Sequence, residues 1–151
     1  MKRSQRLTMV RQVVDDNERR RAESFASSEK RVAECEAKLA ELEAYQLSYA
    51  RDFSARAGQG IAAGGLRDYQ TFLARLGDAV RQQNQLVTRA RLERDADREN
   101  WQGAAQRAEA VGQIVKRWQG EERRAVDRQE QLESDERAQS TYRRSTNTHG
   151  N

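Results

Sequence analysis

The 151-residue sequence contains no proline and only one cysteine, and just 6% of its residues are aromatic. Because proline removes a backbone donor and kinks helices, its absence permits very long uninterrupted helices. The lone cysteine, Cys35, has no partner for an internal disulfide, so we expect it to pack as a small apolar residue. No stretch approaches the roughly 20 apolar residues that span a bilayer. We therefore expect a soluble protein without direct membrane insertion.

Charged residues make up 34% of the chain and hydrophobic residues only 36%, which is poor material for a globular core. The net charge is only +4 over a well-mixed background of 28 basic and 24 acidic residues. The basic triplet Arg19-Arg20-Arg21 is bracketed by acidic residues, so it indicates a solvated helix face rather than a phosphate-binding patch. We expect no nucleic-acid partner. Residues 1–8 are basic but lead into no apolar segment, so we expect a cytoplasmic protein.

Four of the nine glycines fall within the eight residues from Gly58 to Gly65. This run separates two long periodic segments and predicts a hairpin turn over residues 57–65. A glycine-rich run could instead hold a phosphate, but Leu66-Arg67 follows where a phosphate loop needs lysine and serine or threonine. The glycines therefore favour a turn over a nucleotide site.

After the glycines, apolar residues recur at alternating steps of three and four. Fifteen of twenty such positions are apolar, without a phase break. A repeat of 3.5 residues held over this length predicts a left-handed coiled-coil seam, which is narrower than the apolar stripe of a helix on a globule. The seam positions are Leu66, Tyr69, Leu73, Leu76, Val80, Gln83, Val87, Ala90, Arg94, Asp97, Trp101, Ala104, Ala108, Val111, Val115, Trp118, Glu122, Ala125, Gln129 and Leu132.

The segment before the glycines carries the same rhythm and supplies the partner helix. Its seam positions are Phe25, Ser28, Val32, Cys35, Leu39, Leu42, Gln46, Tyr49 and Phe53, with a poorer continuation through Leu7, Arg11, Val14, Glu18 and Arg21. The sequence thus predicts an all-α fold of two long helices that form an antiparallel coiled-coil hairpin over residues 1–140, the second helix longer than the first. We expect the first helix over about 4–56 and the second over about 66–139. Residues 140–151 are polar and aperiodic, which predicts a disordered tail.

Folding the chain at the glycines pairs seam positions whose numbers sum to roughly 118. This register sets Arg21 near Asp97, two seam residues of opposite charge. It also predicts that the second helix overruns the first by about 25 residues, on the order of 40 Å. The predicted overhang, with no partner helix in the chain, carries Val115, Trp118, Ala125 and Leu132.

Catalysis needs titratable groups in a water-excluding pocket, and a two-helix hairpin has none because everything off its seam faces solvent. The single histidine, His149, has no cysteine or histidine neighbour for a metal and no nucleophile to activate. We therefore expect no enzyme activity, no catalytic residue, no metal and no cofactor.

Two aromatic residues lie off the seam, because Tyr45 precedes Gln46 and Phe72 precedes Leu73. One interpretation is that both merely widen the seam. The other is that they form an apolar docking surface with neighbouring residues, as exposed aromatics on a charged rod often do. The neighbours in this surface are Leu42, Tyr49, Leu76 and Ala79.

A Tyr-Gln pair stands on each side of the glycine run, in Tyr45-Gln46-Leu47-Ser48-Tyr49 and in Tyr69-Gln70-Thr71-Phe72. Between them lies Gly58-Gln59-Gly60-Ile61-Ala62, and heptads do not produce this arrangement by chance. Together with Trp101 and residues 127–138, it resembles the FliJ family, the small coiled-coil component of the bacterial flagellar type III export apparatus. The likeness covers most of the chain.

The resemblance implies three partners for a chain that is a monomer when free. These are the hexameric flagellar export ATPase, which the family enters as a central stalk, the cytoplasmic domain of the export-gate membrane protein, and export chaperones. The resemblance also implies peripheral association with the inner membrane at the flagellar base, and a part in flagellum biogenesis, motility and chemotaxis. The gate-binding residues that it implies are Leu42, Tyr45, Tyr49, Phe72, Leu76 and Ala79. The candidates for binding the ATPase are Leu7, Val10, Val14, Trp118 and Leu132.

Three other functions fit parts of the sequence. The chain could be the stalk protein of a non-flagellar type III secretion system, which has the same shape and task. It could be a structural rod that self-associates through its overhang. A basic amphipathic helix that binds anionic membrane or nucleic acid is the third alternative.

Overall fold

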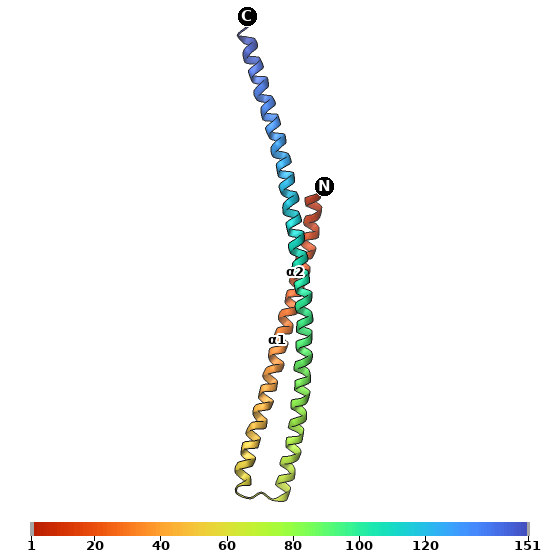
Figure 1. The fold of residues 1–151 in the computed structure, drawn as a ribbon, viewed down its shortest axis with the longest axis vertical. Coiled ribbons are helices and arrows are strands. Elements are labelled where there is room, and N and C mark those ends of the chain that lie inside the picture. The colour runs from red at the N-terminus through yellow and green to blue at the C-terminus, as the bar shows by residue number, and fades with distance from the viewer. Residues whose placement is uncertain (1, 151) are drawn as a thin grey trace. The chain divides into compact units, whose positions relative to one another are not determined.

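The computed structural model describes residues 2–150 and contains two helices, α1 from Arg3 to Ala57 and α2 from Ala63 to Thr148 (Figure 1). They contain 55 and 86 residues respectively. The described residues contain no strand. The predicted all-α antiparallel hairpin with a longer second helix is therefore confirmed. Residues 1 and 151, at the outer ends of the predicted hairpin and tail, lie outside the described residues.

The turn between the helices occupies residues 58–62, so it is shorter than the predicted 57–65. The Gly60 amide donates to the Ala57 carbonyl at 3.3 Å, and Gly60 has a φ of 88° that favours glycine. Gly64 and Gly65 instead lie in the first turn of α2. A Cβ at Gly65 would meet the Ile61 side chain at 3.1 Å, so this glycine lets the turn pack closely on α2.

The structure continues α2 to Thr148, beyond the end expected at residue 139, and residues 140–148 are helical where a disordered tail was expected. No proline or glycine interrupts residues 121–149. The hydroxyls of Thr141 and Thr148 donate to carbonyls four residues earlier, at 2.9 Å each. Threonine can therefore satisfy its hydroxyl without leaving the helix.

The chain divides into two compact units. We call residues 17–104 the turn unit, and residues 2–16 with 105–150 the terminal unit. Each unit contains a segment of both helices, and each is described by itself.

The seam predicted for the turn unit is confirmed for most of its length. Every α2 seam position from Tyr69 to Ala104 is buried or half-buried, as is every α1 position from Phe25 to Phe53 except Tyr49. Full burial of an apolar side chain stabilises a fold by about 1.5–3 kcal/mol. The core of this unit consists of Val32, Leu76, Val87, Ala90 and Ala104.

Polar seam residues in the turn unit have partners. The buried Ser28 hydroxyl donates to the Asp97 carboxylate, and the Gln83 side-chain amide donates to the Cys35 carbonyl at 2.9 Å. Among the described residues, no buried side-chain nitrogen or oxygen atom lacks a hydrogen bond. Polar residues in a seam cost little stability when their side chains are hydrogen-bonded. They also favour one alignment of the two helices over others.

The contacts between the helices confirm the predicted register in one part of the turn unit and correct it in another. Residue numbers sum to 118, as expected, for the Cys35–Gln83 contact, but to 125 for Ser28–Asp97 and to 124 for the Arg31–Glu93 ion pair. Arg21 was expected beside Asp97 and is exposed instead. Seam positions recur every three to four residues, so periodicity alone permits slips of this size. Specific contacts select the alignment, among them the stacked rings of Phe25 and Trp101, whose centroids are 5.9 Å apart.

In the terminal unit, residues 2–16 of α1 lie against α2. Val115 is fully buried, and the buried Ser4 hydroxyl donates to a Glu122 carboxylate oxygen at 2.5 Å. The Arg3 guanidinium lies 4.6 Å from the Trp118 ring centroid, and it forms an ion pair with Glu121 at 3.5 Å. These contacts hold the first turn of α1 in place.

The predicted overhang is wrong in position. Val115 and Trp118 were expected to lack a partner helix, but α1 covers both. From residue 123 to residue 150 every position of the unit is exposed, and these residues include Ala125 and Leu132. The exposed part of α2 therefore starts later than expected, because Ser4 is aligned with Glu122.

Val87 and Leu86 offer a direct test of the seam, because these neighbours are 3% and 45% exposed. Val87→Ala should lower the free energy of unfolding by about 1.5 kcal/mol, since two buried methyl groups are lost from a packed site. Leu86→Ala should change it by less than about 0.5 kcal/mol. Urea denaturation followed by circular dichroism measures both. Equal effects of the two substitutions would show that the seam is placed incorrectly.

The Glu122 carboxylate provides a test in the terminal unit. The Ser4 hydroxyl and amide, with the charges of Lys2 and Arg3, hold the pKa of Glu122 below its ordinary value. Its contribution to stability is therefore present above the ordinary glutamate pKa, and it is lost as pH falls through the lowered one. Ser4→Ala should raise the Glu122 midpoint in an NMR titration, whereas Ser145→Ala should leave it in place. A midpoint unchanged by Ser4→Ala would rule out this contact.

Candidate functional site: exposed aromatic residues beside the turn

The six residues proposed to bind the export gate all lie in the turn unit, and we call them the gate-binding patch. Leu42, Tyr45 and Tyr49 come from α1, and Phe72, Leu76 and Ala79 from α2. The Tyr49 and Phe72 rings meet across the two helices, with centroids 4.3 Å apart and planes tilted by 34°. The structure therefore brings at least these two members together from distant parts of the sequence.

The patch is unevenly accessible. Tyr45, Tyr49 and Phe72 are 51%, 38% and 39% exposed. Leu76 is buried, and Leu42 and Ala79 are half-buried. Because a partner can contact only what is exposed, the three aromatic rings are the available part of the patch. Leu42 and Leu76 belong to the seam, and Ala79 stands next to the seam position Val80.

A second aromatic pair adjoins the patch on the side of the turn. Phe53 and Tyr69 stack with centroids 3.8 Å apart and planes 9° from parallel. The Tyr69 hydroxyl donates to the Tyr49 carbonyl at 3.4 Å. Both residues follow the seam pattern, so the sequence alone predicts core residues at these positions and gives no signal that marks them as part of a site.

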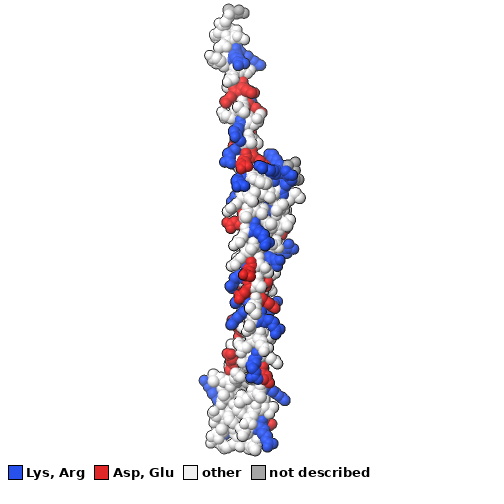
Figure 2. Space-filling view, turned by 45° about the vertical axis from the view of Figure 1, so that its right-hand side comes forward, with Lys and Arg blue, Asp and Glu red and all other residues white. Residues whose placement is uncertain are grey.

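The surface around the turn carries few charges. Figure 2 shows blue and red side chains interleaved along the visible face, and a mainly uncharged area at the end where the turn lies. The ten residues from 57 to 66 include no charged side chain. Leu47 and Leu66 are exposed large apolar residues of the same unit that the sequence analysis did not select. Uncharged apolar surface of this kind is typical of protein docking sites.

The residues proposed to bind the ATPase all lie in the terminal unit. Leu7, Val14 and Trp118 are half-buried, and Arg3 lies over the Trp118 ring. Val10 and Leu132 are exposed. The set thus has two kinds of member. Val10 and Leu132 offer free apolar surface, whereas the others mainly hold α1 against α2.

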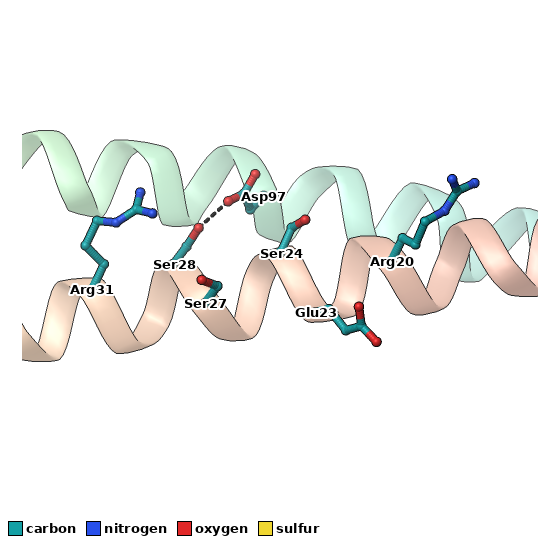
Figure 3. A pocket seen from close by; sticks show the side chains of 7 residues that line it. All are labelled: Arg20, Glu23, Ser24, Ser27, Ser28, Arg31 and Asp97. Carbon is teal, nitrogen blue, oxygen red and sulfur yellow. Dashed lines mark hydrogen bonds between the residues drawn. The ribbon is translucent and has the colours of Figure 1, made fainter.

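A shallow cleft in the turn unit contains several polar side chains (Figure 3). It has a volume of about 560 Å³ and is lined by Arg20, Glu23, Ser24, Ser27, Ser28, Arg31 and Asp97. The Ser28 hydroxyl is committed to Asp97, and Arg31 pairs with Glu93 at 2.8 Å. No histidine lines the cleft, and its buried hydroxyl serves the seam. The arrangement is that of a satisfied polar layer, without an activated nucleophile.

Other site types find no support in residues 2–150. No group of three histidine, cysteine, aspartate or glutamate side chains in this range could hold a metal ion. The His149 ring nitrogen Nδ1 lies 3.2 Å from the Ser145 carbonyl, which belongs to the last residues of α2. None of the helices described is long and apolar enough to cross a bilayer.

Comparison with curated proteins and with solved structures finds no match. A family model does match: the model described as flagellar FliJ protein aligns with residues 2–147. This range includes both helices almost to the end of α2, the turn, and every residue of the gate-binding patch. Because the match covers nearly the whole sequence, the chain belongs to the flagellar FliJ protein family.

Proposed function

We propose that this chain is a non-catalytic stalk of the flagellar export apparatus that links the export ATPase to the export gate and to export chaperones. The observation that carries the proposal is the family match over residues 2–147, combined with exposed aromatic residues on a surface that is otherwise charged. The protein works in the cytoplasm, at the flagellar base beside the inner membrane.

Contact with the gate uses the gate-binding patch. Tyrosine and phenylalanine are frequent anchors in protein interfaces, because a rigid ring buries a large area at little entropic cost. Tyr49 and Phe72 already pack together, so two rings are preorganised before a partner arrives. Tyr45, the most exposed of the three, adds an anchor on α1.

Contact with the ATPase uses the terminal unit. Residues 123–148 of α2 present a helix exposed on all sides, with Val126, Leu132 and Tyr142 as its large apolar side chains. A hexameric ring offers a complete central pore only when assembled. A stalk that binds this pore stabilises the ring by mass action, and raises turnover without chemistry of its own.

The ATPase contact predicts an effect that depends on position. Addition of this protein should promote ring assembly and ATP hydrolysis by the export ATPase. Leu132→Ala should weaken the effect about fivefold if Leu132 is an anchor. Leu92→Ala is the matched control, because these leucines are 59% and 65% exposed and Leu92 lies in the turn unit. Analytical ultracentrifugation and phosphate release measure assembly and turnover. No change in either on addition of the protein would refute the ATPase contact.

The gate contact predicts loss of binding when two rings are removed. Tyr45→Ala combined with Phe72→Ala should weaken binding to the cytoplasmic domain of the gate protein at least about a hundredfold, since two anchors are lost. Helicity by circular dichroism should not change, because both side chains are exposed. Tyr142→Ala, an exposed tyrosine of the terminal unit, should bind normally. Undiminished binding of the double variant in calorimetry would show that the patch is assigned incorrectly.

A further inference from the structure

A pocket of about 610 Å³ lies beside the turn, at the end of the turn unit. Its lining includes the rings of Tyr49, Phe53, Tyr69 and Phe72 and the carboxylates of Asp52 and Asp68. These four rings are nearly half of the nine aromatic residues of the chain. The rings are held in place by the Phe53–Tyr69 stack, the Tyr49–Phe72 contact and the Tyr69 hydrogen bond. The pocket therefore has preorganised aromatic walls.

The net charge of the residues that line the pocket is opposite in sign to that of the whole chain. Two aspartates and one arginine line it, for a net charge of −1, whereas the chain as a whole carries +4. Asp52 and Asp68 are exposed, and neither forms an ion pair or a hydrogen bond through its side chain within residues 2–150. Both carboxylates are thus available to a partner.

The ends of the helices account for the arginine but not for the aspartates. Arg56 lies in the last turn of α1, where a positive charge is stabilised by the unpaired carbonyls of the helix end. Asp68 lies beyond the first turn of α2, which contains no acidic residue, and Asp52 lies more than one turn before the end of α1. The helix dipole acts mainly within a terminal turn, so it does not explain the two carboxylates.

Aromatic faces beside free carboxylates are complementary to a guanidinium group. Arginine stacks on aromatic rings, and its planar fork of donors matches carboxylate oxygens. The same preference already operates within this chain, where Arg98 lies 5.5 Å from the Phe25 ring centroid. Arg56 itself makes no such contact with the pocket rings in the described structure, so their faces are not covered by the chain's own cation.

We propose that this pocket receives an arginine side chain, flanked by apolar residues, from a protein segment of the partner that docks at the turn. The aromatic walls would hold the guanidinium by cation–π contact and the apolar neighbours by burial, while Asp52 and Asp68 accept its hydrogen bonds. Because the pocket shares Tyr49 and Phe72 with the gate-binding patch, the identity of that partner rests on the proposed gate contact. The preference of the pocket for a cation does not depend on the gate contact.

Three short peptides of matched size test the preference on the full-length protein. The probe is acetyl-Leu-Arg-Leu-amide, and the comparison peptides carry citrulline, the uncharged isostere, or glutamate in the central position. NMR titration should place the largest shifts on the rings of Tyr69 and Phe72, and the arginine peptide should bind about tenfold more tightly than the citrulline peptide. Equal affinities for the three peptides, or no binding of the arginine peptide up to its solubility limit, would overturn the proposal.

A charge-matched pair of variants locates the effect. Asp52→Asn with Asp68→Asn should weaken the arginine peptide about tenfold and leave the citrulline peptide unaffected. Glu34→Gln with Glu43→Gln changes the net charge equally at exposed sites outside the pocket, and it should bind the arginine peptide normally. Equal weakening by both double variants would show that the loss of affinity comes from the change in net charge alone, and it would overturn the proposal. Retained arginine selectivity in a protein that fails to bind the gate would support the pocket while refuting the gate contact.

Discussion

Burial of a narrow apolar seam between two helices is the interaction on which the structure of each unit depends. With 34% of its residues charged, the chain has little other apolar material to bury. Val32, Val87 and Val115 are almost completely removed from solvent, while their helical neighbours on other faces are exposed. Each such residue contributes a few kcal/mol at most, so stability comes from repetition of the same contact along the helices.

The seam was predictable because its signal is long and regular. Positions chosen at steps of three and four coincide with buried or half-buried residues from Tyr69 to Trp118. The alignment of the helices was not predictable in the same way, since a slip of one helical turn again brings seam positions opposite one another. The contacts that select it, such as Ser28 with Asp97 and Ser4 with Glu122, join residues whose side chains give no periodic signal. The end of α2 differed for another reason: its polar composition resembles that of disordered segments, yet no residue there breaks a helix.

The candidate site, like the seam, could be predicted from the sequence only in part. Tyr45 and Phe72 could be selected from the sequence because they are aromatic and lie off the seam, and both are exposed. The pocket beside them could not be, because Phe53 and Tyr69 follow the seam pattern and appear as ordinary core residues. Only the structure shows their stacked rings lining a surface pocket with two carboxylates. Membership of the flagellar FliJ family connects the chain to flagellar protein export.

The alignment of α1 and α2 in the turn unit is the central structural claim, because it determines which side chains share the patch and the pocket. Disulfide formation tests it most directly in a Cys35→Ala background. The Ser28→Cys/Asp97→Cys pair should cross-link within one chain under mild oxidation, because the short side chains of these two residues meet in a hydrogen bond and their backbones therefore lie close together. The Ser28→Cys/Ala90→Cys pair, which corresponds to the register expected from periodicity alone, should not. Preferential cross-linking of the second pair would contradict the account.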